Sequence, residues 1–174
     1  EAIDRGKGYE LEDKNDKAKT SDQYLAATQN FADSFDSYLN DKYSTDKKKG
    51  YTLADDIKKI RDTYGHDLEQ FMEKEKVKSN LIQALYNCSA KFLTVIINIL
   101  RSAGPVLVYS NYVLMEGLQL FKVYLKYFGF SSYKDRNSGT PGFRWMEYHG
   151  GIDKDQRSKN IAEFNVIENK DGSI

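Results

Sequence analysis

Apolar residues recur at helical spacing in the first part of the chain. Their spacing predicts a helix over residues 21–42, with Thr20 or Ser21 as its N-terminal cap. The side chains that carry this pattern are Tyr24, Leu25, Phe31, Phe35, Tyr38 and Leu39. The polar residues 1–19 before them are expected to be disordered or loosely attached.

A second apolar stripe predicts a helix over residues 53–77. Its members follow one another at steps of three or four residues: Leu53, Ile57, Ile60, Tyr64, Leu68 and Phe71. Gly65 and His66 lie in the middle of this stripe and are expected to weaken or bend the helix. The intervening residues 44–50 are polar and rich in lysine, which indicates a solvated loop.

The pattern changes after about residue 80. A largely apolar helix is predicted between a cap at Ser89 and a stop at Gly104. The continuous apolar run at residues 106–108 is typical of a β-strand that is buried on both faces. An amphipathic helix is predicted to follow and to end at Gly129.

The last part of the chain repeats the alternation of strand and helix. A polar loop is predicted over residues 131–142, a second strand over 143–148, and a helix that Asp153 caps. Gln156 lies three residues after Asp153, which is the spacing of a capping box. Strands that alternate with helices pair in parallel through right-handed crossovers, so the order predicts parallel strands.

Polar residues follow the first predicted strand, where α/β proteins bind their ligands. Ser110 and Asn111 offer a hydroxyl and an amide, and Tyr112 begins the next predicted helix. The free N–H groups of a helix start can hold a phosphate together with such side chains. The alternative is that Ser110 or Asn111 only caps that helix.

A glycine pair follows the second predicted strand. Gly150 and Gly151 allow the backbone to approach a phosphate closely, and the helix after Asp153 would add its dipole. His149 precedes the pair, and Arg157 lies where its guanidinium can bind a phosphate through two N–H groups. The alternatives are an ordinary strand-to-helix turn, a structural histidine and a solvated helix face.

Composition removes several classes of function. The 26 basic and 26 acidic residues give a net charge of zero, which does not by itself indicate a nucleic-acid or membrane partner. A single cysteine, Cys88, excludes a disulfide within the sequence, and together with His66 and His149 it lacks metal-ligand spacing. The sequence has no GxxxxGK[ST] phosphate loop, and its longest apolar run, near residues 92–100, is too short and too polar to span a bilayer.

Taken together, residues 81–167 resemble a known family. The sequence GPVLVYSNYV is similar to helicase motif IV, and Lys91 and Phe92 lie on the helix before it. The segment after motif IV is matched by Tyr148, Gly150, Arg157, Ile161 and Phe164. The pattern resembles the start of the second RecA-like lobe of superfamily 2 helicases. It is most similar to the Swi/Snf-like helicases of large nucleocytoplasmic DNA viruses, which are related to the poxvirus early transcription factor ATPase.

The resemblance implies an α/β fold, namely a partial RecA-like lobe of parallel strands with flanking helices, preceded by a helical segment. Residues 1–80 would be a helical insertion with a polar N-terminal tail. Residues 81–174 would be the N-terminal part of a truncated C-terminal RecA-like lobe. A sheet of two strands leaves edges and apolar faces exposed, so marginal stability or association is expected.

The resemblance also implies that the chain is a fragment of an ATP-dependent nucleic-acid helicase or translocase of the transcription-factor type. The parent protein would use ATP and Mg²⁺ and would act on nucleic acid, for which duplex DNA is the first expectation. This lobe would pair with the first RecA-like lobe of the same parent chain. No membrane partner is expected. A viral parent would act in the virion or in the viral factory of the host cytoplasm, and any other parent inside a cell.

By analogy with the family, residues Ser110, Asn111, Tyr112, His149, Gly150 and Gly151 would face the phosphodiester backbone, and Arg157 would support that surface. The fragment alone lacks the ATPase motifs, so it is expected to bind no ATP or Mg²⁺ and to have no catalytic residue. Two alternatives stay open. One is a non-enzymatic protein-interaction module of helices plus a small α/β unit, and the other is half of a nucleotide-binding α/β enzyme.

Overall fold

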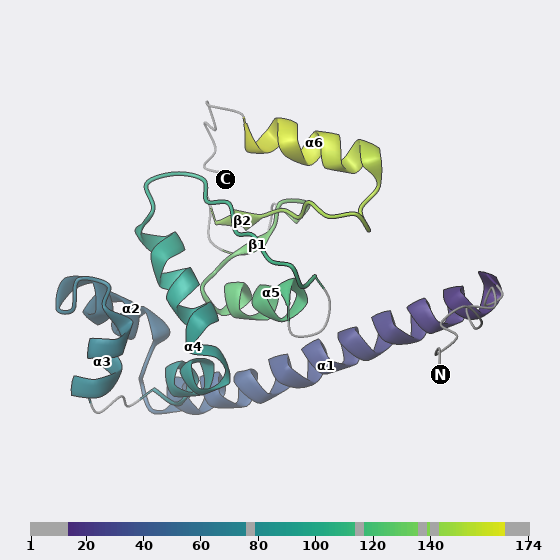
Figure 1. Cartoon of the computed structure of the whole chain (residues 1–174). Helices are drawn as coiled ribbons and strands as arrows, with labels where there is room; N and C mark the ends of the chain where they lie inside the picture. The colour runs from purple at the N-terminus through teal and green to yellow at the C-terminus, as the bar shows by residue number, and fades with distance from the viewer. Residues whose placement is uncertain (1–13, 76–78, 114–116, 136–138, 140–142, 166–174) are drawn as a thin grey trace, which may run out of the picture.

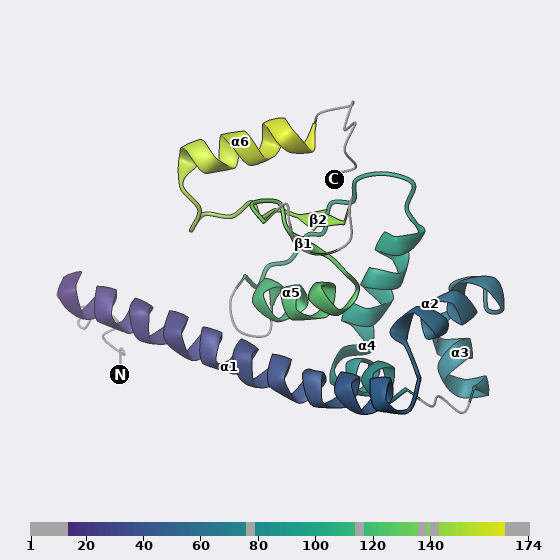
Figure 2. The same ribbon diagram turned by 180° about the vertical axis from the view of Figure 1, so that it is seen from behind.

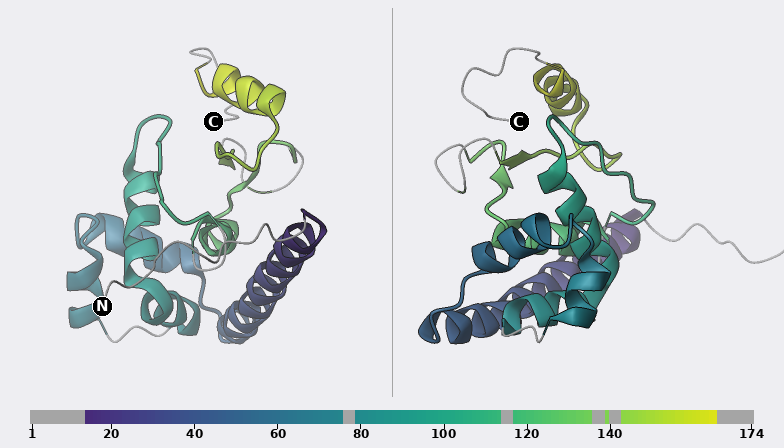
Figure 3. Two further views of the ribbon diagram at one scale, coloured as in Figure 1. Left: turned by 45° about the vertical axis from the view of Figure 1, so that its right-hand side comes forward. Right: turned by 90° about the vertical axis from the view of Figure 1, so that its left-hand side faces the viewer.

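The structure is a computed structural model that describes residues 14–75, 79–113, 117–135, 139 and 143–165. Over these residues the chain is mostly helical, with one short two-stranded sheet (Figure 1). The elements are α1 (Lys14–Lys48), α2 (Leu53–Asp62), α3 (Leu68–Lys74), α4 (Asn80–Arg101), α5 (Leu118–Tyr127), β1 (Ser131–Ser132), β2 (Arg144–Trp145) and α6 (Lys154–Phe164). The sheet lies between α6 and α5, and α5 separates the sheet from α1 (Figures 1 and 3).

One hydrophobic core joins the parts of the chain before and after residue 80. Leu39, Ile60 and Phe71 from the part before are almost fully buried, as are Leu85 and Tyr124 from the part after. α1 packs on both α4 and α5, and α2 packs on α4. The suggested division at residue 80 therefore crosses a continuous core, and it stays a prediction about how the sequence is organised.

Helix α1 is longer at both ends than the apolar pattern predicts. Thr20 and Ser21 lie inside it and are not its cap, and residues 14–19 are helical rather than disordered. Residues 44–48 of the predicted loop also continue the helix, and the turn follows at Gly50 with a φ of 76°. The extension needs no apolar stripe, because lysine and alanine favour helix at its start and lysines suit its last turn.

Up to residue 75, the predicted helix over residues 53–77 is two helices, and residues 76 and 77 lie outside the described residues. Gly65 and His66 have φ angles of 56° and 72°, which end one helix and turn the chain before the next. The hydroxyl of Thr52 accepts a hydrogen bond from the start of α2, and the carboxylate of Asp67 does the same for α3. The expected weak point at Gly65 and His66 is therefore confirmed.

Helix α4 contains the predicted cap at Ser89. This residue has φ −159° and ψ 94°, and its hydroxyl accepts a hydrogen bond from Phe92 N at 3.2 Å. The structure adds two helical turns before the kink and ends the helix at Arg101, shortly before Gly104. None of the helices within the described ranges is both long and apolar enough to cross a membrane.

The strand predicted at residues 106–108 is wrong. Residues 105–113 belong to no helix or strand, and the Leu107 side chain is 84% exposed. A strand buried on both faces needs a ladder partner and covering layers, and among the described residues none pairs with this segment. Only Val108 packs partly against the core. The next helix, α5, begins at Leu118 and ends just before Gly129, whose φ of 85° makes it the predicted stop.

The two strands of the sheet pair in parallel, as the pattern predicts, but one of them is unexpected. β2 lies within the strand predicted over residues 143–148, whereas β1 falls in the predicted loop over 131–142. Ser131 N donates to Phe143 O, and Tyr133 N donates to Trp145 O. The observed partner of the second predicted strand is therefore β1 and not the run at 106–108. The structure supports a partial α/β arrangement and does not extend to a RecA-like sheet.

Candidate nucleic-acid interface

The first candidate segment forms a compact turn on the surface. The Ser110 hydroxyl accepts a hydrogen bond from Tyr112 N and donates to Tyr112 O. The Asn111 amide oxygen accepts a 2.6 Å hydrogen bond from the Tyr109 hydroxyl. The Tyr112 ring is 75% exposed. Ser110 and Asn111 therefore do not cap α5, because both side chains are used inside this turn.

The turn is attached to α5 through Gly117. Leu118 N donates to Tyr112 O, and Gln119 N donates to Val113 O. A side chain at Gly117 would overlap the carbonyl group and Cβ of Tyr112, so only glycine fits at this position. The backbone at Tyr112 is thus held by α5 while its side chain stays in solvent.

The second candidate segment is the turn between β2 and α6. Gly151 N donates to His149 Nδ1 at 3.1 Å, so the neutral imidazole carries its proton on Nε2. A Cβ added at Gly150 would meet nothing within 4 Å, and this residue does not have a positive φ. Gly150 is therefore not required by the local fold, and its bare backbone leaves an open surface.

Glu147 connects this turn to α5 and α6. Its carboxylate oxygen Oε1 lies 2.9 Å from Lys122 Nζ and 3.9 Å from His149 Nε2. Its backbone oxygen accepts a hydrogen bond from Asn160 Nδ2 at 2.8 Å. Lys122 Nζ also lies 5.0 Å from the centre of the Trp145 ring. These contacts fix the position of the turn through two helices.

The start of α6 is already occupied by a side chain of the protein. Asp153 Oδ1 accepts hydrogen bonds from Asp155 N and Gln156 N, so Asp153 is the predicted cap. Gln156 does not complete a capping box, because its amide donates to Asn160 Oδ1 instead. A fixed carboxylate at this position opposes a second anion on the same N–H groups. A phosphate would therefore meet Gly150 and not the first turn of α6.

Arg157 lies over an exposed aromatic ring. Its guanidinium carbon is 5.8 Å from the centre of the Tyr148 ring, which is 62% exposed. Stacking of this kind orients a guanidinium while its N–H groups stay available. The predicted solvated helix face and the predicted phosphate contact are both compatible with this geometry.

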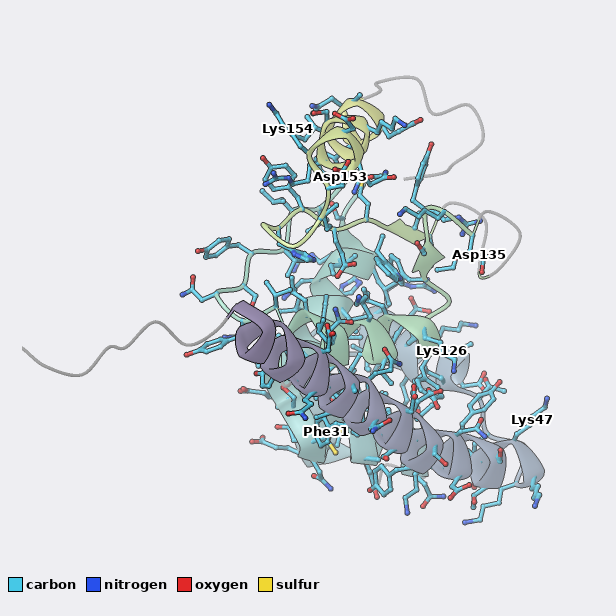
Figure 4. All side chains as sticks on the ribbon, turned by 90° about the vertical axis from the view of Figure 1, so that its right-hand side faces the viewer. Phe31, Lys47, Lys126, Asp135, Asp153 and Lys154 are labelled. Carbon is cyan, nitrogen blue, oxygen red and sulfur yellow. The ribbon has the colours of Figure 1, made fainter. Side chains whose placement is uncertain are left out.

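The two candidate segments are not bonded to each other. Within the described residues, no hydrogen bond or ion pair joins 110–112 to 149–151. Asp153 and Lys154, which follow the second segment, lie at the end of the molecule opposite Lys47 (Figure 4). The single anion-binding rim that the sequence predicts from two neighbouring strands stays a prediction, because the first of those strands is missing here.

Sequence reasoning missed the buried carboxylate of Asp46. It accepts hydrogen bonds from the Ser79 hydroxyl, from the backbone and side-chain amides of Asn80, and from Leu81 N. These contacts join the end of α1 to the start of α4. The only sequence signal was Ser79 before an apolar run, since no local pattern shows that a distant aspartate completes a helix cap.

The chain is similar along nearly its whole length to a viral protein. It is 29% identical over 175 residues to a protein of Acanthamoeba polyphaga mimivirus named "Putative ATP-dependent RNA helicase R350". The match covers 99% of this chain and 21% of that protein, so the chain spans about a fifth of the length of its relative. No protein-family model matches the chain. No solved structure matches it.

This similarity supports a relationship to viral helicases, and it is not specific enough to select the Swi/Snf-like branch. The aligned stretch includes nearly all of the helical first half, in which the sequence patterns alone indicated no family. The helical region and the later region therefore occur together in both proteins. Within the described ranges, no three His, Cys, Asp or Glu side chains lie close enough to hold a metal ion.

Proposed function

We propose that this chain is part of an ATP-dependent nucleic-acid helicase or translocase, in which it contributes contacts to the nucleic-acid backbone. The observation that carries the proposal is the similarity of almost the entire chain to a protein named as an RNA helicase. The candidate residues are compatible with this role, because the Tyr112 ring and the backbone of Gly150 are exposed.

The contacts would be of two kinds. The exposed backbone of Gly150 offers an N–H group beside the open space where a Cβ would lie, and Arg157 offers a guanidinium that Tyr148 orients. Phosphate groups bind well to both kinds of donor. Ser110 and Asn111 would add a hydroxyl and an amide, and the exposed rings of Tyr112 and Tyr148 can stack on an unpaired base.

In this proposal the rest of the parent protein supplies the chemistry. ATP and Mg²⁺ would be bound by a first RecA-like lobe of the same polypeptide, and this chain would close on it. A virion or a viral factory in the host cytoplasm would be the place of action. The resemblance favours duplex DNA, whereas the relative is named for RNA, so both duplexes belong in the test.

The test measures binding of labelled DNA and RNA duplexes of about 20 base pairs by fluorescence anisotropy over a series of salt concentrations. Arg157→Ala is expected to weaken binding and to reduce the salt slope by about 1. Its control is Arg61→Ala, because Arg61 is an exposed residue of α2 whose only ion-pair partner among the described residues is its neighbour Asp62.

Gly150→Val gives an independent result. A Cβ at this position meets no protein atom within 4 Å, so the valine side chain begins in open space and is expected to leave the fold unchanged while it blocks the approach of a phosphate. Gly104→Val is the matched control, because Gly104 is exposed and also has open space around it. Salt-independent binding, or equal affinity for all variants, would favour the non-enzymatic interaction module over the helicase fragment.

A further inference from the structure

The first half of α1 has an apolar surface that the described residues leave uncovered. α1 runs along the molecule, and its N-terminal part extends beyond the other elements in views from opposite sides (Figures 1 and 2). Tyr24, Leu25 and Phe31 are 47%, 48% and 45% exposed. Single exposed apolar side chains are common on protein surfaces. These three, however, lie close together on one helix.

The exposed residues continue the face that packs on the rest of the molecule. Thr28 and Leu39 are buried on α1, and they define the side that faces the body. With 3.6 residues per turn, Tyr24 and Leu25 flank the same line one turn before Thr28. The apolar face of α1 is therefore longer than the surface that covers it.

An acidic edge flanks this face on the side of Leu25, whereas Tyr24 and Phe31 form the opposite side of the face. Residues 20–41 contain four aspartates and no lysine or arginine. Asp22 and Asp33 are 11 positions apart, which is about three turns and places them on one side of the helix. Asp36 lies on the same side. A surface of this charge repels nucleic acid and attracts a cationic partner.

Where helix α5 covers the acidic edge, its side chains bind one of the aspartates. Lys126 Nζ lies 2.6 Å from Asp36 Oδ2, and the Tyr127 hydroxyl donates to Asp36 O at 2.9 Å. Beside them, the rings of Phe35 and Tyr124 stack at 5.7 Å. α5 thus combines an apolar face with a basic residue at its edge. Asp33 has only its neighbour Gln29 as a hydrogen-bond partner among the described residues.

We propose that the uncovered part of α1 docks a basic amphipathic helix of a partner protein. Its apolar side would pack on Tyr24, Leu25 and Phe31, and long lysine or arginine side chains at its edge next to Leu25 would reach Asp22 and Asp33. This helix would extend along α1 the packing that α5 begins. The interaction is distinct from the nucleic-acid contacts proposed above, and it does not depend on them.

The test uses a fluorescein-labelled amphipathic peptide of about 18 residues, long enough to form a helix, built from leucine, alanine and lysine. A second peptide carries glutamate at every lysine position. The unmodified chain is expected to bind the lysine peptide and not the glutamate peptide, with an affinity that falls as salt rises. Tyr24→Ser with Leu25→Ser should weaken binding at least about tenfold, as expected for the loss of central apolar contacts.

Charge reversal separates this docking from nonspecific attraction. Asp22→Lys with Asp33→Lys should lose the lysine peptide and gain the glutamate peptide. The matched control reverses two exposed acidic residues of α3, Glu69→Lys with Glu73→Lys, and should change neither affinity. All these positions are exposed, and circular dichroism during heating verifies that each variant keeps its fold.

Three outcomes would overturn the proposal. The first is equal loss of binding in the α3 control, and the second is binding of both peptides with the same affinity. The third is a dimer of the chain in sedimentation that Tyr24→Ser with Leu25→Ser dissociates, because the occupant would then be a second copy and not a partner protein.

Discussion

Asp46 is the residue on which the joint between the first and second halves of the chain depends most. The side chain is 3% exposed and accepts four hydrogen bonds from Ser79, Asn80 and Leu81. Burial by itself raises its pKa, but the hydrogen bonds from Asn80, Leu81 and Ser79 outweigh burial and lower it. The carboxylate therefore remains ionised and acts as the cap of α4 from a distant helix.

Asp46→Ala is expected to reduce the free energy of unfolding by about 3 kcal/mol, because it leaves several buried donors without an acceptor. Urea denaturation measures the loss, and Asp41→Ala, an exposed aspartate of the same helix, is the control. The lowered pKa means that Asp46 stabilises the fold above its unfolded pKa of 3.8 and that this contribution is lost as the pH falls below it. A midpoint equal to that of Asp41→Ala would contradict this role.

The pKa of Asp56 is shifted in the opposite direction to that of Asp46. Its pKa is raised to about 6, mainly by burial and also by the nearby carboxylates of Asp46 and Asp55, whereas the Ser79 hydroxyl and Lys59 act in the lowering direction. One of its carboxylate oxygens is buried without a hydrogen-bond partner among the described residues. A raised pKa in the folded state means that the contribution of Asp56 to stability is fully present below its unfolded pKa of 3.8 and is lost as the pH rises through about 6.

Asp56→Asn is therefore expected to be more stable than the unmodified chain at pH 7 and above, and equal to it near pH 4. The gain should be roughly 1–2 kcal/mol, after an allowance for the partial exposure of the group. Thermal unfolding between pH 4 and pH 8 measures it, with Asp41→Asn as the control for the removal of one charge. A constant difference across this range would show that the asparagine stabilises for another reason.

At the scale of elements, local signals predicted the helices better than the strands. Ser89 and Gly129 were identified correctly because a cap and a left-handed glycine are properties of a few neighbouring residues. The run at 106–108 was misassigned because a strand exists only with a partner, and here the partner of β2 is the short strand β1. No periodicity marks Ser131 and Ser132 as a strand, since two residues are too few to show one.

Gly117 joins two elements and offers a test at this scale. Gly117→Ala is expected to separate the Ser110–Tyr112 turn from α5, because the new Cβ would overlap backbone atoms of Tyr112 that cannot move without breaking the hydrogen bond from Leu118. The loss of stability should be about 2 kcal/mol or more, as for other steric conflicts with backbone. Chemical denaturation measures it, and Gly104→Ala, which meets no atom, should be close to neutral.

At the scale of the whole molecule, the sequence predicted the residues of a candidate site more readily than their arrangement. Gly150 and Arg157 follow β2 in the predicted order, and both are available to a ligand. The prediction that they share a surface with Ser110 required the strands at 106–108 and 143–148 to be neighbours in one sheet. Such pairing joins residues far apart in the sequence, and no local pattern shows it. The conflict between the Asp153 carboxylate and a phosphate at α6 also appears only when the cap is seen in place.

The exposed run before α5 leads to a last prediction, about association. The Leu107 and Tyr109 side chains are 84% and 83% exposed, and Val106 beside them is 39% exposed. The backbone groups of residues 106–109 have no hydrogen-bond partner among the described residues, and an extended apolar segment of this kind favours pairing with another chain. Burying one leucine contributes roughly 1.5–3 kcal/mol. Leu107→Lys should therefore shift the chain towards the monomer in sedimentation velocity while its melting temperature stays the same, because Leu107 contacts little of the core.

Leu25→Lys is the comparison, since it removes an equally apolar side chain from α1. If only Leu25→Lys favours the monomer, association runs through α1, and the run at 106–108 is not the site of self-association.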